Sequence, residues 1–352
     1  MSRLLEFEIG GATYAAAGVD IEAGDSAVEQ IKSVVASTHR SGVMGSIGDF
    51  GGLFNLGELG YTHPVLVSSA DGVGTKLHVA QIAQRFEGVG HDLVAMLVDD
   101  LVCVGAEPLF LLDIITVGKL NTDRVATIVT SIAEGCRRAH TALIGGETAE
   151  HGGVMGVDDI DVAGFAVGVL EEGTQIGAHR VTEGDALVGF HSPGIRSNGY
   201  TLARSVLLDG RSLDTPAWPG ASVTLTDELL RPSVIYAPAV VAIKKAIGDQ
   251  LHGVAHITGG GIVGNVPRML PAHLNAKIDL SSFETPEIFF EIQRRGRVTA
   301  DEMLRVFNCG LGMVLAVASE RVDDVIALAH DHGVVGTQVG SMCVGEGRVE
   351  LS

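Results

Sequence analysis

Residues 91–114 read HDLVAMLVDDLVCVGAEPLFLLDI, and this stretch decides the fold class. Its first part, 93–106, carries apolar residues on most faces of a predicted helix. The next part, PLFLLDIITV at 108–117, is short, apolar and β-branched, which is typical of a buried strand. A helix followed at once by a strand indicates an α/β architecture.

The same alternation continues on both sides. In the first half, strands are predicted at 65–70, 141–145 and 161–170, and helices at 75–86 and 122–140. A second series has predicted strands at 186–192, 252–258, 314–318, 337–342 and 348–351, and helices at 199–208, 233–247, 261–270 and 320–332. The polar stretch 171–183 lies between them. We expect two α/β domains of α+β type, 1–175 and 176–352, each able to hold a core of its own.

The charge balance argues against two classes of partner. The chain has 352 residues with 24 Lys+Arg and 43 Asp+Glu, a formal net charge of −19. Nucleic acids and anionic membrane surfaces both attract clustered cations, so neither is an expected partner. Residues 1–175 hold 24 of the acidic residues but nine of the basic ones. The first half therefore tolerates or uses a concentration of carboxylates.

The sequence also predicts a cytoplasmic protein. The N-terminus, MSRLLEFEIGG, lacks the apolar core of a secretory signal, and no apolar run approaches the ~20 residues of a membrane helix. Cysteines stand at 103, 136, 309 and 343 without a CxxC pair, which argues against a zinc site or a disulfide framework.

Three acidic motifs in the first half predict a site for Mg²⁺ and phosphate. In SADGVGTK (69–76), a strand ends in Asp71, and glycines lead to Thr75 and Lys76 at a helix start. In VDDL (98–101), one carboxylate can face a site while the other faces away. In IGGETAE (144–150), a Gly-Gly pair precedes Glu147. Asp71, Asp100 and Glu147 would together supply hard oxygen ligands for Mg²⁺.

Each motif also has a plainer interpretation. SADGVGTK is also typical of a tight strand-to-helix turn, VDDL of a solvated notch, and IGGETAE of a turn with solvent-facing acids. The glycine-rich stretch 41–52 (SGVMGSIGDFGG) is either a lid over bound phosphates or a bland mobile loop. Lys32 before it is a candidate phosphate partner or a solvated surface charge.

The second half offers polar loops for a substrate. GIRSNG (194–199) places Ser197 and Asn198 before a helix, as substrate contacts or as helix caps. HITGGG (256–261) is a strand end followed by glycines and a helix, a second plausible phosphate site. A lone His256 is more often structural than a ligand. Two phosphate sites would fit a nucleotide and a sugar phosphate.

Eight motifs, in order, give the chain a family resemblance. It resembles the phosphoribosylformylglycinamidine cyclo-ligases, also called aminoimidazole ribonucleotide synthetases. The motifs are YAAAGVDIEAG (14–24), SADGVGTK (69–76), HDLVAMLVDDLVCVGAEPLFLLDI (91–114), GGETAE (145–150), DVAGFAVGV (161–169), SNGYTLAR (197–204), HITGGGIVGNVPRMLP (256–271) and FNCGLGM (307–313). The family is similar in build to selenophosphate synthetase and thiamine-phosphate kinase.

The resemblance implies an ATP-driven ring closure in purine biosynthesis, a homodimer and a set of site residues. The N-terminal domains would pair across a β-barrel-like interface. The implied catalytic residues are Asp71, Lys76, Asp100 and Glu147, of which Asp71, Asp100 and Glu147 would bind Mg²⁺. Contacts to ATP are implied for Lys32, Gly48, Asp49, Gly72, Gly74, Thr75, Asp99, Gly145 and Gly146, and contacts to the ribonucleotide phosphate substrate for Ser197, Asn198, Thr258, Gly259, Gly260, Gly261 and Arg268.

The chain departs from the family pattern at three places. Arg196 stands where the family usually has His, His151-Gly152-Gly153 replaces a common Pro-Gly turn, and Ser233-Val234 replaces Thr-Arg. An Arg side chain cannot take over proton transfer from a His, because it stays charged. Two other classes therefore stay open: another small-molecule phosphotransferase of the same superfamily, and a non-catalytic paralogue that binds nucleotide.

Overall fold

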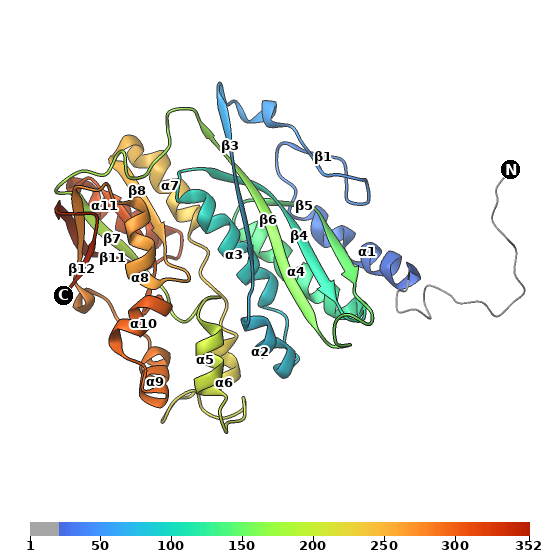
Figure 1. The fold of residues 1–352 in the computed structure, drawn as a ribbon. Coiled ribbons are helices and arrows are strands. Elements are labelled where there is room, and N and C mark those ends of the chain that lie inside the picture. The colour runs from blue at the N-terminus through green and yellow to red at the C-terminus, as the bar shows by residue number, and fades with distance from the viewer. Residues whose placement is uncertain (1–20) are drawn as a thin grey trace, which may run out of the picture.

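The structure, a computed structural model, describes residues 21–352. The predictions made on the N-terminal segment, and most of the 14–24 motif, lie outside the described residues. The described chain forms two sheet-containing domains with helices packed on the sheets (Figure 1). This confirms the predicted mixed α/β class.

The N-terminal domain is built on a four-stranded sheet in the order β3-β6-β4-β5. β4 and β5 are parallel, and the other neighbours are antiparallel. The strands are β3 (Pro64–Gly72), β4 (Glu107–Val117), β5 (Ala142–Glu150) and β6 (Ile160–Glu171), with a separate pair β1 (Val43–Met44) and β2 (Leu53–Phe54). The helices are α1 (Ile21–Ala36), α2 (Lys76–Ala83), α3 (Val89–Val102) and α4 (Thr122–Arg138).

The C-terminal domain is built on a six-stranded sheet in the order β12-β9-β11-β7-β10-β8. Its strands are β7 (Ala186–His191), β8 (Leu251–His256), β9 (Leu274–Ile278), β10 (Leu311–Val317), β11 (Gly336–Val344) and β12 (Val349–Leu351). Its helices are α5 (Tyr200–Leu207), α6 (Leu225–Leu229), α7 (Ala237–Ile247), α8 (Gly261–Asn265), α9 (Glu287–Gly296), α10 (Ala300–Val306) and α11 (Val322–Asp331). β9, α9 and α10 are elements beyond those predicted from the sequence, and α9 has one buried face with Ile288, Phe289 and Ile292.

Helix α3 lies between the two sheets and joins them (Figure 1). Thirteen of its fourteen residues are buried, because it is apolar on nearly every face. It packs on β3, β4 and β6 on one side and on α7 and β8 on the other. One hydrophobic cluster therefore runs from Leu93 and Leu97 to Phe190, Tyr236 and Val240. This core crosses the predicted domain boundary, whereas a second cluster, which includes Val181, Leu274 and Val314, lies wholly in the C-terminal half. The predicted domain bounds stay a prediction.

Strand β5 continues through IGGETAE, for which a turn was the plainer interpretation. The Gly-Gly pair at 145–146 stays in the ladder opposite Leu112 and Asp113 of β4. A Cβ at Gly146 would lie 2.3 Å from the Asp113 Oδ1 atom, so glycine is needed for this close approach rather than for a bend.

Among the described residues, no helix is long and apolar enough to cross a membrane. The cysteines at 103, 136, 309 and 343 are all free thiols.

Replacing Gly90 should loosen the packing of α3 on α4. A Cβ at Gly90 would lie 2.3 Å from the Ile132 backbone nitrogen, so the two helices would have to separate. We expect Gly90→Ala to lower the free energy of unfolding by about 1–3 kcal/mol in urea titrations. The control is Gly264→Ala in α8, where no atom lies within 4 Å of the new Cβ. Equal stability of the two variants would contradict the prediction.

Candidate active site

Two of the three predicted metal carboxylates meet where the domains join. Asp71 lies near the end of β3 and Asp100 near the end of α3, and His256 lies at the end of β8. The His256 Nδ1 atom is 2.8 Å from the Asp100 Oδ1 atom, and the Ser69 hydroxyl donates to the other Asp100 oxygen at 3.4 Å. One Asp71 oxygen accepts the Gly72 N–H at 2.7 Å. Both carboxylates belong to the N-terminal domain, and His256 adds a contact from the C-terminal domain.

The electrostatics of this pair suit a divalent cation. Burial raises the pKa of Asp71, and the neighbouring Asp100 charge adds to the rise. Burial also acts to raise the pKa of Asp100, but the interactions with His256, Ser69 and Arg268 together outweigh it and hold that pKa below its ordinary value. Mg²⁺ commonly binds through one or two carboxylates plus phosphate oxygens. Asp71 and Asp100 fit that ligand set.

Adjacent Asp99 and Asp100 point in different directions, as the sequence predicted. The Asp100 side chain is 42% exposed, whereas the Asp99 side chain is fully buried. Asp99 accepts the Tyr236 and Ala237 backbone N–H groups at 2.8 and 2.9 Å. Its other oxygen accepts from Arg196 at 2.8 Å. Asp99 thus has protein partners on both oxygens, and its predicted contact with ATP stays a prediction.

Lys76 has a buried partner instead of an open phosphate site. Its side chain is 1% exposed, and its Nζ atom lies 2.5 Å from the Asp92 carboxylate and 2.7 Å from the Arg231 carbonyl oxygen. Asp92 in turn accepts from the Ser233 N–H and hydroxyl. Burial lowers the pKa of Lys76, and Asp92 opposes that change. The structure gives Lys76 a structural role, and its catalytic role stays a prediction.

Glu147 does not join Asp71 and Asp100 within one chain. The register aligns Asp71, Gly164, Asp113 and Gly146 across the sheet, so Glu147 lies one residue further along β5. It therefore projects from the opposite face, about 14 Å away across three strand spacings. Within residues 21–352, no group of three or more His, Cys, Asp or Glu side chains could hold a metal. Glu147 therefore does not form a three-carboxylate set with Asp71 and Asp100 in one chain, and the metal role of these residues stays a prediction.

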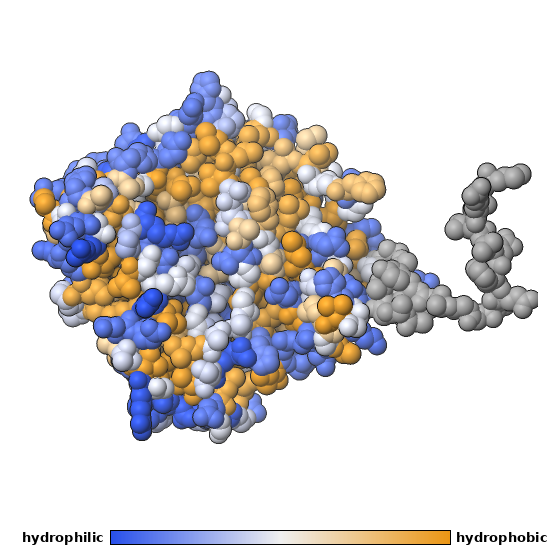
Figure 2. Space-filling model, in the orientation of Figure 1, coloured by the Kyte–Doolittle hydropathy of each residue, from blue (hydrophilic) through white to orange (hydrophobic). Residues whose placement is uncertain are grey.

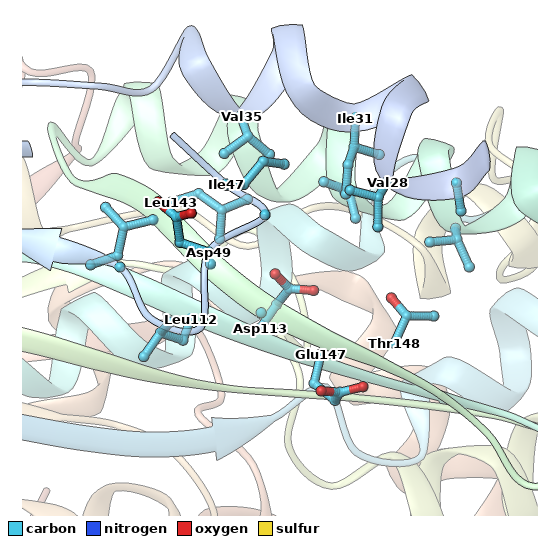
Figure 3. A pocket seen from close by; sticks show the side chains of 18 of the residues that line it. Val28, Ile31, Val35, Ile47, Asp49, Leu112, Asp113, Leu143, Glu147 and Thr148 are labelled. Atoms are coloured by element: carbon cyan, nitrogen blue, oxygen red, sulfur yellow. The ribbon is translucent and has the colours of Figure 1, made fainter. Parts of the chain in front are cut away.

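Several residues that we predict to contact ATP line a cavity of about 470 Å³ beside α1 (Figure 3). Gly48, Asp49, Gly145, Gly146 and Glu147 all border it. Its apolar wall comes from α1, whose Val28, Ile31 and Val35 side chains point towards the strands.

Lys32 of the same helix does not line this cavity. Its side chain is 50% exposed, and its Nζ atom lies 2.5 Å from the Glu29 carboxylate. The position matches the plainer interpretation of a solvated surface charge.

Asp113 is a polar residue in the wall of this cavity that the sequence analysis did not single out. Its side chain is buried and points into the space between α1 and the sheet (Figure 3). Burial raises the pKa of Asp113 to about 7. The available signal was a single carboxylate inside the apolar run PLFLLDIITV.

The predicted substrate residues lie opposite the SADGVGTK loop. The Thr75 and Thr201 hydroxyls are 3.2 Å apart, and a Cβ at Gly74 would lie 3.6 Å from the Ser197 carbonyl oxygen. The Ser197 hydroxyl is buried without a hydrogen-bond partner. A Cβ at Gly259 would lie 4.0 Å from the Asn198 amide nitrogen, so the 258–261 segment lies beside the loop that carries Ser197 and Asn198. Arg268 is exposed, and its charge acts on Asp100.

Comparisons with known proteins agree with this architecture. The family models for the AIR synthase related protein match residues 58–170 with the N-terminal domain and residues 182–351 with the C-terminal domain. A phosphoribosylformylglycinamidine cyclo-ligase from Trichlorobacter lovleyi is 49% identical over 333 residues, which cover 94% of this chain and 95% of that protein.

Solved structures extend the likeness of fold. A thiamine-monophosphate kinase from Stenotrophomonas maltophilia has a TM-score of 0.64 at 18% identity, covering 91% of this chain and 94% of its own. The hydrogenase maturation protein HypE, solved in complex with ATP, has a TM-score of 0.63 at 17% identity, covering 90% and 88%. At such identities the likeness concerns the fold alone.

Replacing Lys76 should destabilise the protein strongly. Lys76→Met would leave the Asp92 carboxylate buried without its cation, and we expect the free energy of unfolding to fall by about 3–5 kcal/mol. The matched control, Lys32→Met, breaks an exposed pair and should cost less than about 1 kcal/mol. Urea unfolding measures both. A similar loss for both variants would show that the buried pair has no special role.

Proposed function

The chain belongs to the AIR synthase related family, and we propose that it acts as a phosphoribosylformylglycinamidine cyclo-ligase in purine biosynthesis. The observation that carries the proposal is the near full-length likeness to the Trichlorobacter relative that bears this name. The reaction converts formylglycinamidine ribonucleotide and ATP to 5-aminoimidazole ribonucleotide, ADP and phosphate. ATP phosphorylates the formyl amide oxygen, the internal amidine nitrogen attacks the same carbon, and phosphate leaves as the imidazole forms.

This chemistry requires positioning and charge neutralisation rather than a protein nucleophile. Ring closure inside one bound molecule gains from proximity, and phosphoryl transfer gains from cations placed around the phosphate oxygens. Three of the four thiols are poorly suited to nucleophilic attack: burial raises the pKa of Cys309 to about 12 and also raises the pKa values of Cys103 and Cys136.

We assign Asp71 and Asp100 as the residues that would hold Mg²⁺. The cation would neutralise charge on the ATP phosphates during transfer. The chain's own contribution is to keep the two carboxylates close together, with Ser69 and His256 bound to Asp100. Removing either carboxylate would leave the phosphates without a fixed anchor.

We propose that the cavity beside α1 binds the nucleoside end of ATP. Its wall combines apolar side chains of α1 with the backbone of Gly145 and Gly146, which leaves room for a flat base. Asp49 and Asp113 place carboxyl groups in its lining, so it suits hydrogen-bond donors such as amino and ribose hydroxyl groups better than phosphates. The phosphates would extend towards the Asp71–Asp100 pair.

The substrate would bind on the C-terminal side of the same junction. The unpartnered Ser197 hydroxyl and the adjacent Asn198 amide offer hydrogen bonds, and the Thr258–Gly261 backbone approaches them. Arg268 adds an exposed cation near Asp100 that suits the substrate phosphate.

We further propose a homodimer formed through the exposed face of the four-stranded sheet. Leu66 of β3, Ile114 of β4 and Phe165 of β6 are 60%, 48% and 38% exposed on this face. Apolar residues gather on the surface where these strands run (Figure 2). An open apolar face on a sheet is a typical site of association. Glu147 projects from the same face of the sheet.

We expect the enzyme to be located in the cytoplasm.

The activity assay tests the proposed reaction directly. Purified protein with formylglycinamidine ribonucleotide, ATP and Mg²⁺ should form aminoimidazole ribonucleotide and ADP in equal amounts. Asp71→Asn and Asp100→Asn should each lower kcat by about 100-fold or more, because a charge aimed at the transferring phosphate is lost. Asp331→Asn, on the exposed surface of α11, is the control. Production of ADP solely with a different acceptor would refute the proposed function.

The dimer is tested by the mass of the protein in solution. The double variant Ile114→Asp/Phe165→Asp would place charges on the proposed interface and should convert a dimer to a monomer in light scattering. Val344→Asp introduces the same charge at a 69% exposed site on the other sheet, and should leave the dimer intact. A native chain that is monomeric at micromolar concentration would overturn the proposal.

A further inference from the structure

The Arg196 side chain is buried in the protein interior and has contacts on several sides. Residue 196 is 3% exposed and has a left-handed backbone, with φ at +66°. Its Nη1 donates to the Val234 carbonyl oxygen at 3.0 Å, and the guanidinium lies 4.7 Å from the centre of the Tyr236 ring. A left-handed conformation is costly for a residue other than glycine, and persists where the surroundings determine it. Several contacts thus hold this side chain in one position.

The guanidinium connects a buried carboxylate to a histidine. The Arg196 Nη2 atom lies 2.8 Å from the Asp99 Oδ2 atom and 3.0 Å from the His256 Nε2 atom. The other Asp99 oxygen is held by two backbone N–H groups, so Asp99 is itself fixed. Asp99 therefore orients Arg196, and Arg196 faces His256.

Hydrogen-bond chemistry fixes the direction of the next two bonds. A guanidinium has donors but no acceptor, so the His256 Nε2 atom must accept. The ring proton then resides on Nδ1, which donates to the Asp100 Oδ1 atom at 2.8 Å. A histidine at position 196 would be able to donate or accept, and would not impose one tautomer on His256.

We propose that Arg196 is a positioning residue, which fixes the Nδ1–H tautomer of His256 and through it the orientation of the Asp100 carboxylate at the domain junction. The proposal rests on the proposed function, because it assigns Asp100 to the ATP site. Arg196 itself is enclosed by Asp99, Val234, Tyr236 and His256, so it acts through His256 and not on the substrate.

Nitrogen NMR of the full-length protein tests the tautomer without turnover. The protein is labelled with ¹⁵N in the rings of its 13 histidines, and the His256 signals are assigned by their loss in His256→Gln. In the native chain at fixed pH, Nδ1 should carry the proton and Nε2 should not. In Arg196→Met, which removes the donors, this pattern should be lost. If Arg196→Met keeps the native pattern, the proposal is overturned.

Kinetics test whether the tautomer matters for the reaction. Loss of a residue that orients a metal ligand typically costs 10–100-fold, so Arg196→Met should lower kcat by about that factor while the KM for the ribonucleotide changes little. Unchanged kcat with an altered tautomer would overturn the positioning role. A native chain without cyclo-ligase activity would refute the proposed function instead, and the NMR result would still decide the tautomer.

Two further variants serve as a substitute, in case Arg196→Met does not fold, and as a control. If Arg196→Met does not fold, Arg196→Lys keeps a cation beside Asp99 but cannot reproduce the forked donors, and it should still alter the His256 pattern. Arg180→Met removes an arginine that binds Asp249 and the Gly173 carbonyl oxygen elsewhere in the C-terminal domain. It should leave both the His256 signals and kcat unchanged, and a change as large as that in Arg196→Met would contradict the proposal.

Discussion

The need to satisfy two buried carboxylates on α3 determines how the domains meet. Asp92 and Asp99 are seven residues apart and fully buried, and an uncompensated charge in such a place costs several kcal/mol. Asp92 is satisfied by Lys76 and Ser233, and Asp99 by Arg196 and the backbone of Tyr236 and Ala237. Each carboxylate therefore binds the 233–237 segment of the C-terminal domain, and this segment is held along α3.

This attachment sets the geometry of the candidate active site. Because α3 is fixed between both sheets, its last turn presents Asp100 towards Asp71 and His256 at the domain junction. Phosphoryl transfer depends on placing charges within a fraction of an ångström, and a rigid helix is better suited to that task than a loop. The buried ion pairs thus support function through position, and the apolar contacts around them supply most of the stability.

The glycine-rich and acidic character of the first half also acquires a structural meaning. Some carboxylates face the domain junction, some line the cavity beside α1, and Asp92 and Asp99 serve as internal anchors. The glycines at 90 and 146 allow close backbone approaches, between α3 and α4 and between β4 and β5. The face of the four-stranded sheet with Leu66, Ile114 and Phe165 is an apolar feature that the described chain leaves open.

The sequence by itself determined the mixed α/β class, most elements with a strong period, the family and the divergence of Asp99 from Asp100. It also pointed to the segments that meet at the junction, because glycine and carboxylate motifs at strand ends are local signals. Only the tertiary structure decided which carboxylate serves which purpose. The strand register places Glu147 on the face of the sheet opposite Asp71. Lys76 pairs with Asp92, 16 positions away, and Arg196 with Asp99, 97 positions away. A buried anchor and a ligand have the same residue types in the sequence, and they differ only in which distant groups surround them.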